Sequence, residues 1–163
     1  KRILDVINFY CFFLRNVLYL RQYKKARYFN TFCVRKGIEM APNESAENYL
    51  ETILILSRKL PVVRSVDIAN ELGFKKSSIS IAMKNLREKQ LITVSDAGFI
   101  NLTDAGREIA DMIYERHEFL TSWLTKLGVD PEIAAEDACK MEHVVSKESF
   151  QAIKNFVAST RTE

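Results

Sequence analysis

The order of local patterns in residues 65–102 constrains the fold of this chain more than any other feature. A short helix is predicted over residues 66–72, where Ser65 suits the N-cap position and Gly73 suits the C-terminal stop. A second amphipathic helix is predicted over residues 77–89. A short helix, a glycine-containing turn and a second helix in this order are typical of a helix-turn-helix unit.

A hairpin is predicted directly after the second of these helices. Residues 91–94 and 98–102 have the composition of two short strands, and residues 95–98 carry the turn signal between them. A hairpin in this position is typical of the wing of a winged helix. An amphipathic helix over residues 44–58 precedes the pattern, so we expect residues 41–102 to form a winged-helix domain.

The charge of the chain is distributed unevenly. Residues 58–89 carry eight basic and three acidic groups, a net charge of +5, whereas residues 90–163 carry seven and thirteen, a net charge of −6. This asymmetry favours a nucleic-acid-facing module joined to one that does not face nucleic acid, although a basic helical pair can also be a solvated face.

Residues at and after the start of the 77–89 helix are the candidates for contact with DNA. Lysine and arginine neutralise phosphates, serine hydroxyls meet phosphates or base edges, and an isoleucine can contact thymine methyl groups. The predicted DNA-binding residues are Lys75, Lys76, Ser77, Ser78, Ser80, Ile81, Lys84 and Arg87.

Residues 103–163 are predicted to form three further helices. Thr103 suits the N-cap of a long helix over residues 104–127, and Asp130-Pro131 opens a helix through residue 144. A last helix follows Ser146. Three helices bury this much apolar surface poorly in isolation, so we expect a two-fold homodimer, which suits a palindromic operator on double-stranded DNA.

A thiol, a carboxylate and an imidazole share one face of the predicted helix over residues 131–144. Cys139, Glu142 and His143 stand at i, i+3 and i+4, and these side-chain types bind transition metals well. The only other histidine is His117, on the long helix. A solvated histidine and a small core cysteine are the ordinary alternatives.

Several stretches together carry a family resemblance. They are Glu47-Asn48-Tyr49-Leu50-Glu51-Thr52-Ile53, Val66-Asp67-Ile68-Ala69, Ser77-Ser78-Ile79-Ser80, Leu102-Thr103-Asp104-Ala105-Gly106, Arg116-His117-Glu118 and Asp137-Ala138-Cys139-Lys140-Met141-Glu142-His143. On these stretches residues 44–158 resemble the diphtheria toxin repressor family of metal-dependent regulators, which includes the manganese transport regulators.

The resemblance implies a mainly α-helical protein, with a winged helix-turn-helix DNA-binding domain followed by a helical metal-binding and dimerisation domain over residues 103–163. Where the manganese branch has aspartate and the iron branch methionine, this chain has Asn48. Where the iron branch has the Glu and His of its second metal site, it has Thr121 and Ala135. The resemblance places metal ligands at Asn48, Glu51, His117, Cys139, Glu142 and His143.

The expected cofactor is a divalent transition metal, Fe(II) or Mn(II). Two imidazoles and a thiolate favour Fe(II), and carboxylates suit Mn(II). We therefore expect a metal-dependent DNA-binding repressor of iron or manganese homeostasis genes. The alternative is a metal-independent or redox-sensing winged-helix regulator, with Cys139 as the redox switch.

Other functions and compartments are disfavoured by the sequence. It contains no His-Glu-x-x-His motif, P-loop, Gly-rich cofactor loop or Gly-x-Ser-x-Gly elbow, so we expect no enzyme and no small organic substrate. Three cysteines make no disulfide framework, which favours the reducing cytoplasm. We expect no membrane association of the regulator.

Residues 1–40 form an atypical basic and aromatic extension. They hold nine basic and two acidic residues and nine of the seventeen aromatics. A helix on a membrane surface and a DNA-touching arm are alternatives. We favour a third interpretation: the natural protein begins at Met40, and the preceding segment is upstream sequence resembling a ribosome-binding site. Intact-mass analysis of the protein from its native cell would test this.

Overall fold

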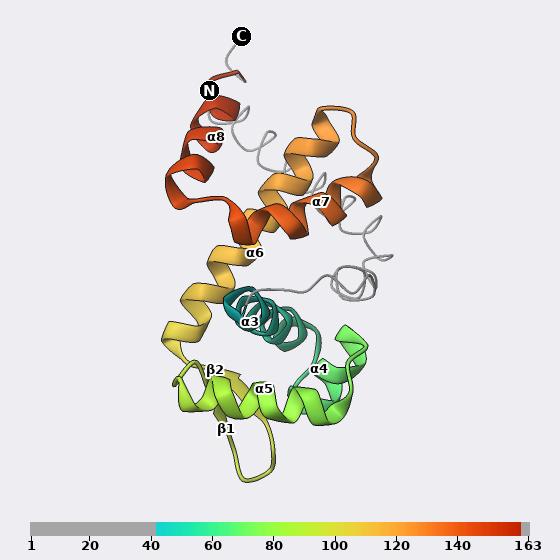
Figure 1. Cartoon of the computed structure of the whole chain (residues 1–163), viewed down its shortest axis with the longest axis vertical. Helices are drawn as coiled ribbons and strands as arrows, with labels where there is room; N and C mark the ends of the chain where they lie inside the picture. The colour runs from blue at the N-terminus through green and yellow to red at the C-terminus, as the bar shows by residue number, and fades with distance from the viewer. Residues whose placement is uncertain (1–41, 161–163) are drawn as a thin grey trace, which may run out of the picture.

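The computed structural model describes residues 42–160, so the expectations about residues 1–40 fall outside the described residues. The described part contains six helices and one hairpin (Figure 1). In chain order the elements are α3 (Pro42–Lys59), α4 (Ser65–Leu72), α5 (Lys76–Glu88), β1 (Ile92–Val94), β2 (Ile100–Leu102), α6 (Asp104–Lys126), α7 (Pro131–Val144) and α8 (Lys147–Ser159). None of these helices is both long and apolar enough to cross a membrane.

The first five elements form the expected winged helix-turn-helix unit. β1 and β2 pair antiparallel, with Thr93 opposite Asn101, and the backbone N–H of Gly98 donates to the carbonyl of Ser95 in the turn between them. The helices and the hairpin enclose one apolar core. Its fully or nearly fully buried members include Leu50, Ile53, Leu54, Ile68, Leu72, Ile79, Met83, Leu86, Ile92 and Ile100.

The start of α4 differs from the sequence prediction. The helix begins at Ser65 itself, so the N-cap position falls to Arg64. The carboxylate of Asp67 takes over the capping role, because its Oδ2 accepts the backbone N–H of Arg64 at 2.8 Å. At the other end, Gly73 adopts the left-handed conformation expected of it, with φ +71°.

α6 joins the winged-helix unit to the C-terminal helices (Figure 1). The hydroxyl oxygen of Thr103 caps it as predicted, accepting the backbone N–H of Gly106 at 3.1 Å. Gly106 allows a close approach, since a Cβ there would overlap the carbonyl oxygen of Leu91. That carbonyl already accepts the backbone N–H of Thr103, so the start of α6 is fixed against the base of the hairpin.

α7 and α8 pack at the far end of α6 (Figure 1). Asp130 caps α7, with its Oδ1 accepting the backbone N–H of Glu132, and Ser146 caps α8 by accepting the backbone N–H of Ser149. A second, smaller apolar cluster forms here, built from Leu120, Ala138 and Phe150 with Phe119, Trp123, Met141 and Val145 around them. Residues 42–160 therefore contain two apolar cores, and α6 contributes to both.

Candidate metal centre

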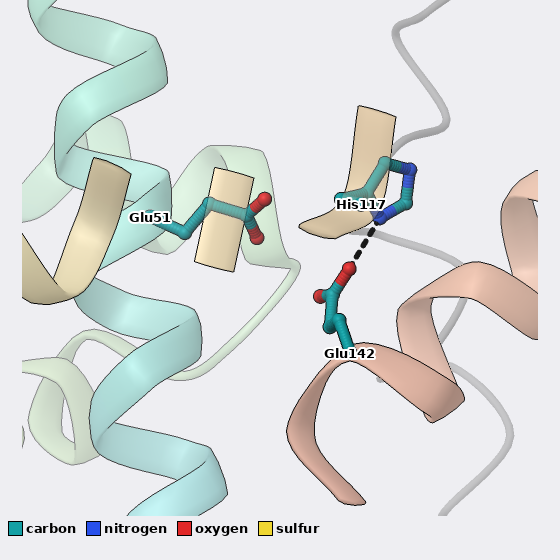
Figure 2. A group of neighbouring side chains, drawn as sticks. All are labelled: Glu51, His117 and Glu142. Carbon is teal, nitrogen blue, oxygen red and sulfur yellow. Dashed lines mark hydrogen bonds and ion pairs between the residues drawn. The ribbon is translucent and has the colours of Figure 1, made fainter. Parts of the chain in front are cut away.

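Three polar side chains from three helices converge between the two cores. Glu51 comes from α3, His117 from α6 and Glu142 from α7, and Figure 2 shows their polar ends directed toward one another. Each offers one donor atom such that all three atoms lie within 4.8 Å of one another. All three residues are buried, with exposed fractions of 1%, 1% and 0%.

The position of Glu51 follows from the packing of α3. Leu50, Ile53 and Leu54 anchor that helix in the winged-helix core, while α3 also packs against α6. Glu51 therefore belongs to the winged-helix unit but faces the C-terminal helices. Asn48 lies three residues earlier on α3, is also buried, and its carbonyl accepts the hydroxyl of Thr52 at 2.8 Å.

His117 and Glu142 are joined by a short hydrogen bond. Nδ1 of His117 lies 2.7 Å from Oε2 of Glu142 (Figure 2). Burial, reinforced by the nearby His143, lowers the pKa of His117 from 6.5 to about 3, so its ring is neutral near neutral pH. A carboxylate only accepts hydrogen bonds, so the neutral ring donates from Nδ1 to Glu142 in this arrangement. Nδ1 is also the ring atom that faces the cluster, whereas Nε2 is directed away from Glu51 and Glu142 (Figure 2), so a metal bound here would use the lone pair of Nδ1 with the ring proton on Nε2.

His143 lies between two carboxylates from different helices. Its Nδ1 is 2.8 Å from Oε2 of Glu47 on α3, and its Nε2 is 3.3 Å from Oε1 of Glu142 on α7. Sequence reasoning did not select Glu47 as a site residue. The available signal was its spacing four residues before Glu51, which puts the two carboxylates on one face of a helix.

A second residue that sequence reasoning missed fixes the end of α7. Nη1 of Arg116 donates to the backbone carbonyls of Glu142 at 2.8 Å and of Val145 at 3.0 Å. Its guanidinium also lies 5.5 Å from the centre of the Phe150 ring. Arg116 directly precedes His117. The same turn of α6 therefore supplies the imidazole of His117 to the cluster and holds α7, the helix that carries Glu142.

The donor atoms of the cluster suit a divalent transition metal. Two carboxylates and a neutral imidazole are typical ligands of Mn(II) and Fe(II). Bonds of about 2.0–2.2 Å to one ion separate its ligand atoms by roughly 3–4 Å, and the three donor atoms here lie within 4.8 Å of one another. Two carboxylates this near one another also repel when both are ionised, which favours a cation between them.

The structure brings three of the six predicted ligands together, namely Glu51, His117 and Glu142. His143 contacts this group through Glu142 but does not belong to it. Cys139 is buried on α7, three residues before Glu142, and also lies outside the group. The structure thus leaves the roles of Asn48, Cys139 and His143 as predictions.

The predicted DNA-contacting residues lie on the open face of α5 and just before it. All eight are exposed, namely Lys75, Lys76, Ser77, Ser78, Ser80, Ile81, Lys84 and Arg87. By contrast Ile79, Met83 and Leu86 of the same helix are buried in the core. Ile81 is the apolar member of this exposed set, with 63% of its surface exposed.

Comparison with known families gives two matches that together span most of the described chain. Residues 43–98 match the iron dependent repressor N-terminal DNA binding domain, and residues 103–163 match the iron dependent repressor metal binding and dimerisation domain. Among curated relatives, the transcriptional regulator MntR of Escherichia coli O6:H1 is 36% identical over 122 residues, which cover 75% of this chain and 79% of the relative.

Solved structures of metal regulators share the fold. The manganese regulator SloR matches 73% of this chain with a TM-score of 0.63 and 25% identity. A manganese-dependent transcriptional repressor in complex with manganese matches 69% of this chain with a TM-score of 0.64 and 27% identity. This chain spans about half the length of these two proteins, covering 55% and 52% of them.

Proposed function

This chain belongs to the family of iron-dependent repressors, and we propose on that premise that it represses genes of manganese or iron homeostasis when the metal is bound. Residues 41–102 form the DNA-binding domain and residues 103–163 the metal-binding and dimerisation domain. The observation that carries the proposal is the cluster of three potential metal ligands. In it, Glu51 of the DNA-binding domain meets His117 and Glu142 of the metal-binding and dimerisation domain.

The ligands proposed to hold the metal are Glu51, His117 and Glu142, joined by Asn48, Cys139 and His143 from the same helices. A bound divalent cation supplies positive charge that offsets the repulsion between the two buried carboxylates. Each ligand is fixed to one domain by the helix that carries it. α3 holds Glu51 rigidly with the winged helix, and α6 and α7 hold His117 and Glu142 rigidly with the dimerisation domain. Their convergence fixes the orientation of α5 relative to the dimer axis.

The required coupling is moderate in size. Moving DNA occupancy from about 1% to 99% requires the competent orientation to be favoured by about 5.5 kcal/mol. Ligands from three helices, present in both subunits of a dimer, can supply that difference. The fixed separation of the two α5 helices then matches a palindromic operator on double-stranded DNA.

The donor set bears on the choice between the two metals. The preference for Fe(II) expected from sequence rested on two imidazoles and a thiolate, but the three donors that converge are two carboxylates and one imidazole. Such oxygen-rich sites suit Mn(II). We therefore propose Mn(II) or Fe(II) as the cofactor, with Mn(II) favoured unless Cys139 contributes its sulfur.

The remaining features of the proposal follow from the family. The similar proteins are named as transcriptional regulators, and we propose no catalytic activity and no small organic substrate for this chain. We propose that it acts in the cytoplasm as a homodimer.

Titration of metal into a DNA-binding assay tests the proposal. We expect Mn(II), and Fe(II) under anaerobic conditions, to raise the affinity of the wild-type protein for its operator at least tenfold, and His117→Ala to abolish the increase. Glu108→Gln is a matched control, because Glu108 is exposed on α6. Operator affinity that ignores both metals would instead favour the metal-independent alternative.

A further inference from the structure

We infer that Glu47 is a positioning residue for His143: its carboxylate holds the imidazole proton on Nδ1 and thereby keeps Nε2 available toward the metal centre. The inference rests on the proposed metal-dependent function. It assigns a role to a residue that is not among the proposed ligands and that comes from a different helix from the one carrying His143.

The geometry favours one proton position on the ring. In its neutral form an imidazole carries one N–H, and two carboxylates lie within reach of the ring of His143. Glu47 Oε2 is 2.8 Å from Nδ1, whereas Glu142 Oε1 is 3.3 Å from Nε2. The contact at Nδ1 is a hydrogen bond, whereas the contact at Nε2 has only the distance of an ion pair, so the proton is held on Nδ1.

Loss of Glu47 would reverse this arrangement. Without an acceptor at Nδ1, the proton gains most by moving to Nε2, where it donates to Glu142. The lone pair would then point away from the cluster, and one oxygen of Glu142 would be engaged by an N–H group. A single substitution on α3 would thus impair two proposed metal ligands on α7, His143 and Glu142.

The position of His143 explains why it needs an anchor from elsewhere. It is the second-last residue of α7, which ends at Val144. Its side chain is 6% exposed and that of Glu47 is 27% exposed, so solvent competes only weakly with their contact. Glu47 also lies one turn before Glu51 on α3. The helix that supplies Glu51 to the cluster therefore also orients His143.

The test compares four proteins: wild type, Glu47→Ala, Glu47→Gln and the surface control Glu108→Gln. Mn(II) affinity is measured by electron paramagnetic resonance of the unbound ion, without DNA. We expect Glu47→Ala to bind Mn(II) about 10–100-fold more weakly than wild type, as is usual when the partner of a ligating histidine is removed. Glu47→Gln retains an acceptor oxygen and is expected to bind more tightly than Glu47→Ala.

A metal-free measurement separates orientation from general destabilisation. With ¹⁵N-labelled histidine, we expect the chemical shifts of His143 to report Nδ1–H in the wild type and in Glu47→Gln, and Nε2–H in Glu47→Ala. The inference is overturned if Glu47→Ala keeps Nδ1–H, or if it binds Mn(II) within threefold of wild type. Wild-type protein that binds neither Mn(II) nor anaerobic Fe(II) would overturn the proposed function as well, whereas normal Mn(II) binding by both Glu47 variants would overturn this inference alone.

Discussion

His117 is held by its surroundings in the neutral state that a metal ligand requires. Burial lowers its pKa to about 3, and its Nδ1 contacts Glu142 at 2.7 Å. The ring therefore has no proton to release when a metal binds near neutral pH. A histidine held neutral in this way also makes the folded state sensitive to acid, because the unfolded chain protonates the same ring more easily.

The pH dependence of stability tests this claim. The pKa of His117 is lower in the folded protein than the ordinary 6.5, so below pH 6.5 the unfolded state binds a proton that the folded state does not. Its contribution to stability is complete above pH 6.5 and is lost as the pH falls toward 3. We expect about 2 kcal/mol to be lost between pH 6.5 and 5, from about 1.4 kcal/mol per pH unit.

Urea denaturation in the presence of a chelator, at several pH values, measures this effect. His117→Gln removes the titrating ring but keeps a buried amide, so its stability is expected to fall less steeply over the same pH range. Equal slopes for the two proteins would show that His117 is not held neutral by the fold.

At the scale of elements, Arg116 of α6 holds the C-terminal end of α7. The last carbonyls of a helix have no hydrogen-bond partner within the helix. Here Arg116 donates hydrogen bonds to the carbonyls of Glu142 and Val145. We expect Arg116→Met to lower the free energy of unfolding by about 2–3 kcal/mol, since hydrogen bonds from a charged donor are lost at a buried site. Chemical denaturation without metal measures it.

Arg116→Lys provides the matched comparison for this contact. It keeps the charge but not the planar group that reaches two carbonyls, so we expect it to recover only part of the lost stability. If Arg116→Met unfolds at the same denaturant concentration as wild type, the end of α7 is held by the apolar cluster alone.

α5 carries two kinds of predicted DNA-contacting residue, which the salt dependence of binding can distinguish. Lys76 is exposed and charged, and Ile81 is exposed and apolar. Lys76→Ala is expected to weaken binding to all DNA sequences and to lower the salt slope by about one unit, as loss of a phosphate contact does. Ile81→Ala is expected to leave the salt slope unchanged and to reduce discrimination between operator and random DNA.

Fluorescence anisotropy over a range of salt concentrations, with metal present, gives both quantities. Lys126→Ala serves as a control, since Lys126 lies at the far end of α6 from the winged helix. An unchanged salt slope for Lys76→Ala would place that lysine away from the phosphates.

At the scale of the whole molecule, most of the fold was predictable because its signals are local. The caps at Thr103 and Ser146, the turn at Gly73 and the hairpin after α5 each depend on a few neighbouring residues. The start of α4 was predicted wrongly for the same reason, since either Ser65 or Asp67 could cap it and sequence spacing does not rank them.

The site was predictable only in part, because its contacts join distant parts of the chain. The resemblance to a known family placed Glu51, His117 and Glu142 at ligand positions, and the structure brings them together. The contact between Glu47 and His143 joins residues 96 positions apart, and Arg116 reaches carbonyls 26 and 29 residues away. No local pattern reports such pairs; they depend on how α3, α6 and α7 pack.

The arrangement of the whole molecule suits a two-fold dimer in which bound metal sets the distance between the two winged-helix domains. α6 connects the winged helix to the C-terminal helices (Figure 1). Large apolar side chains at this end of the molecule remain exposed. Leu127, Ile133, Val144 and Phe156 are each more than half exposed in the single chain. Such surface suits the dimerisation expected of the family.

Anomalous X-ray scattering from crystals of the homodimer loaded with Mn(II) tests the central claim most directly. We expect an anomalous peak in each subunit within bonding distance of Glu51, His117 and Glu142, so that one ion contacts the winged-helix unit and the dimerisation domain together. Fully loaded crystals whose peaks touch residues of only one of these two units would contradict the account.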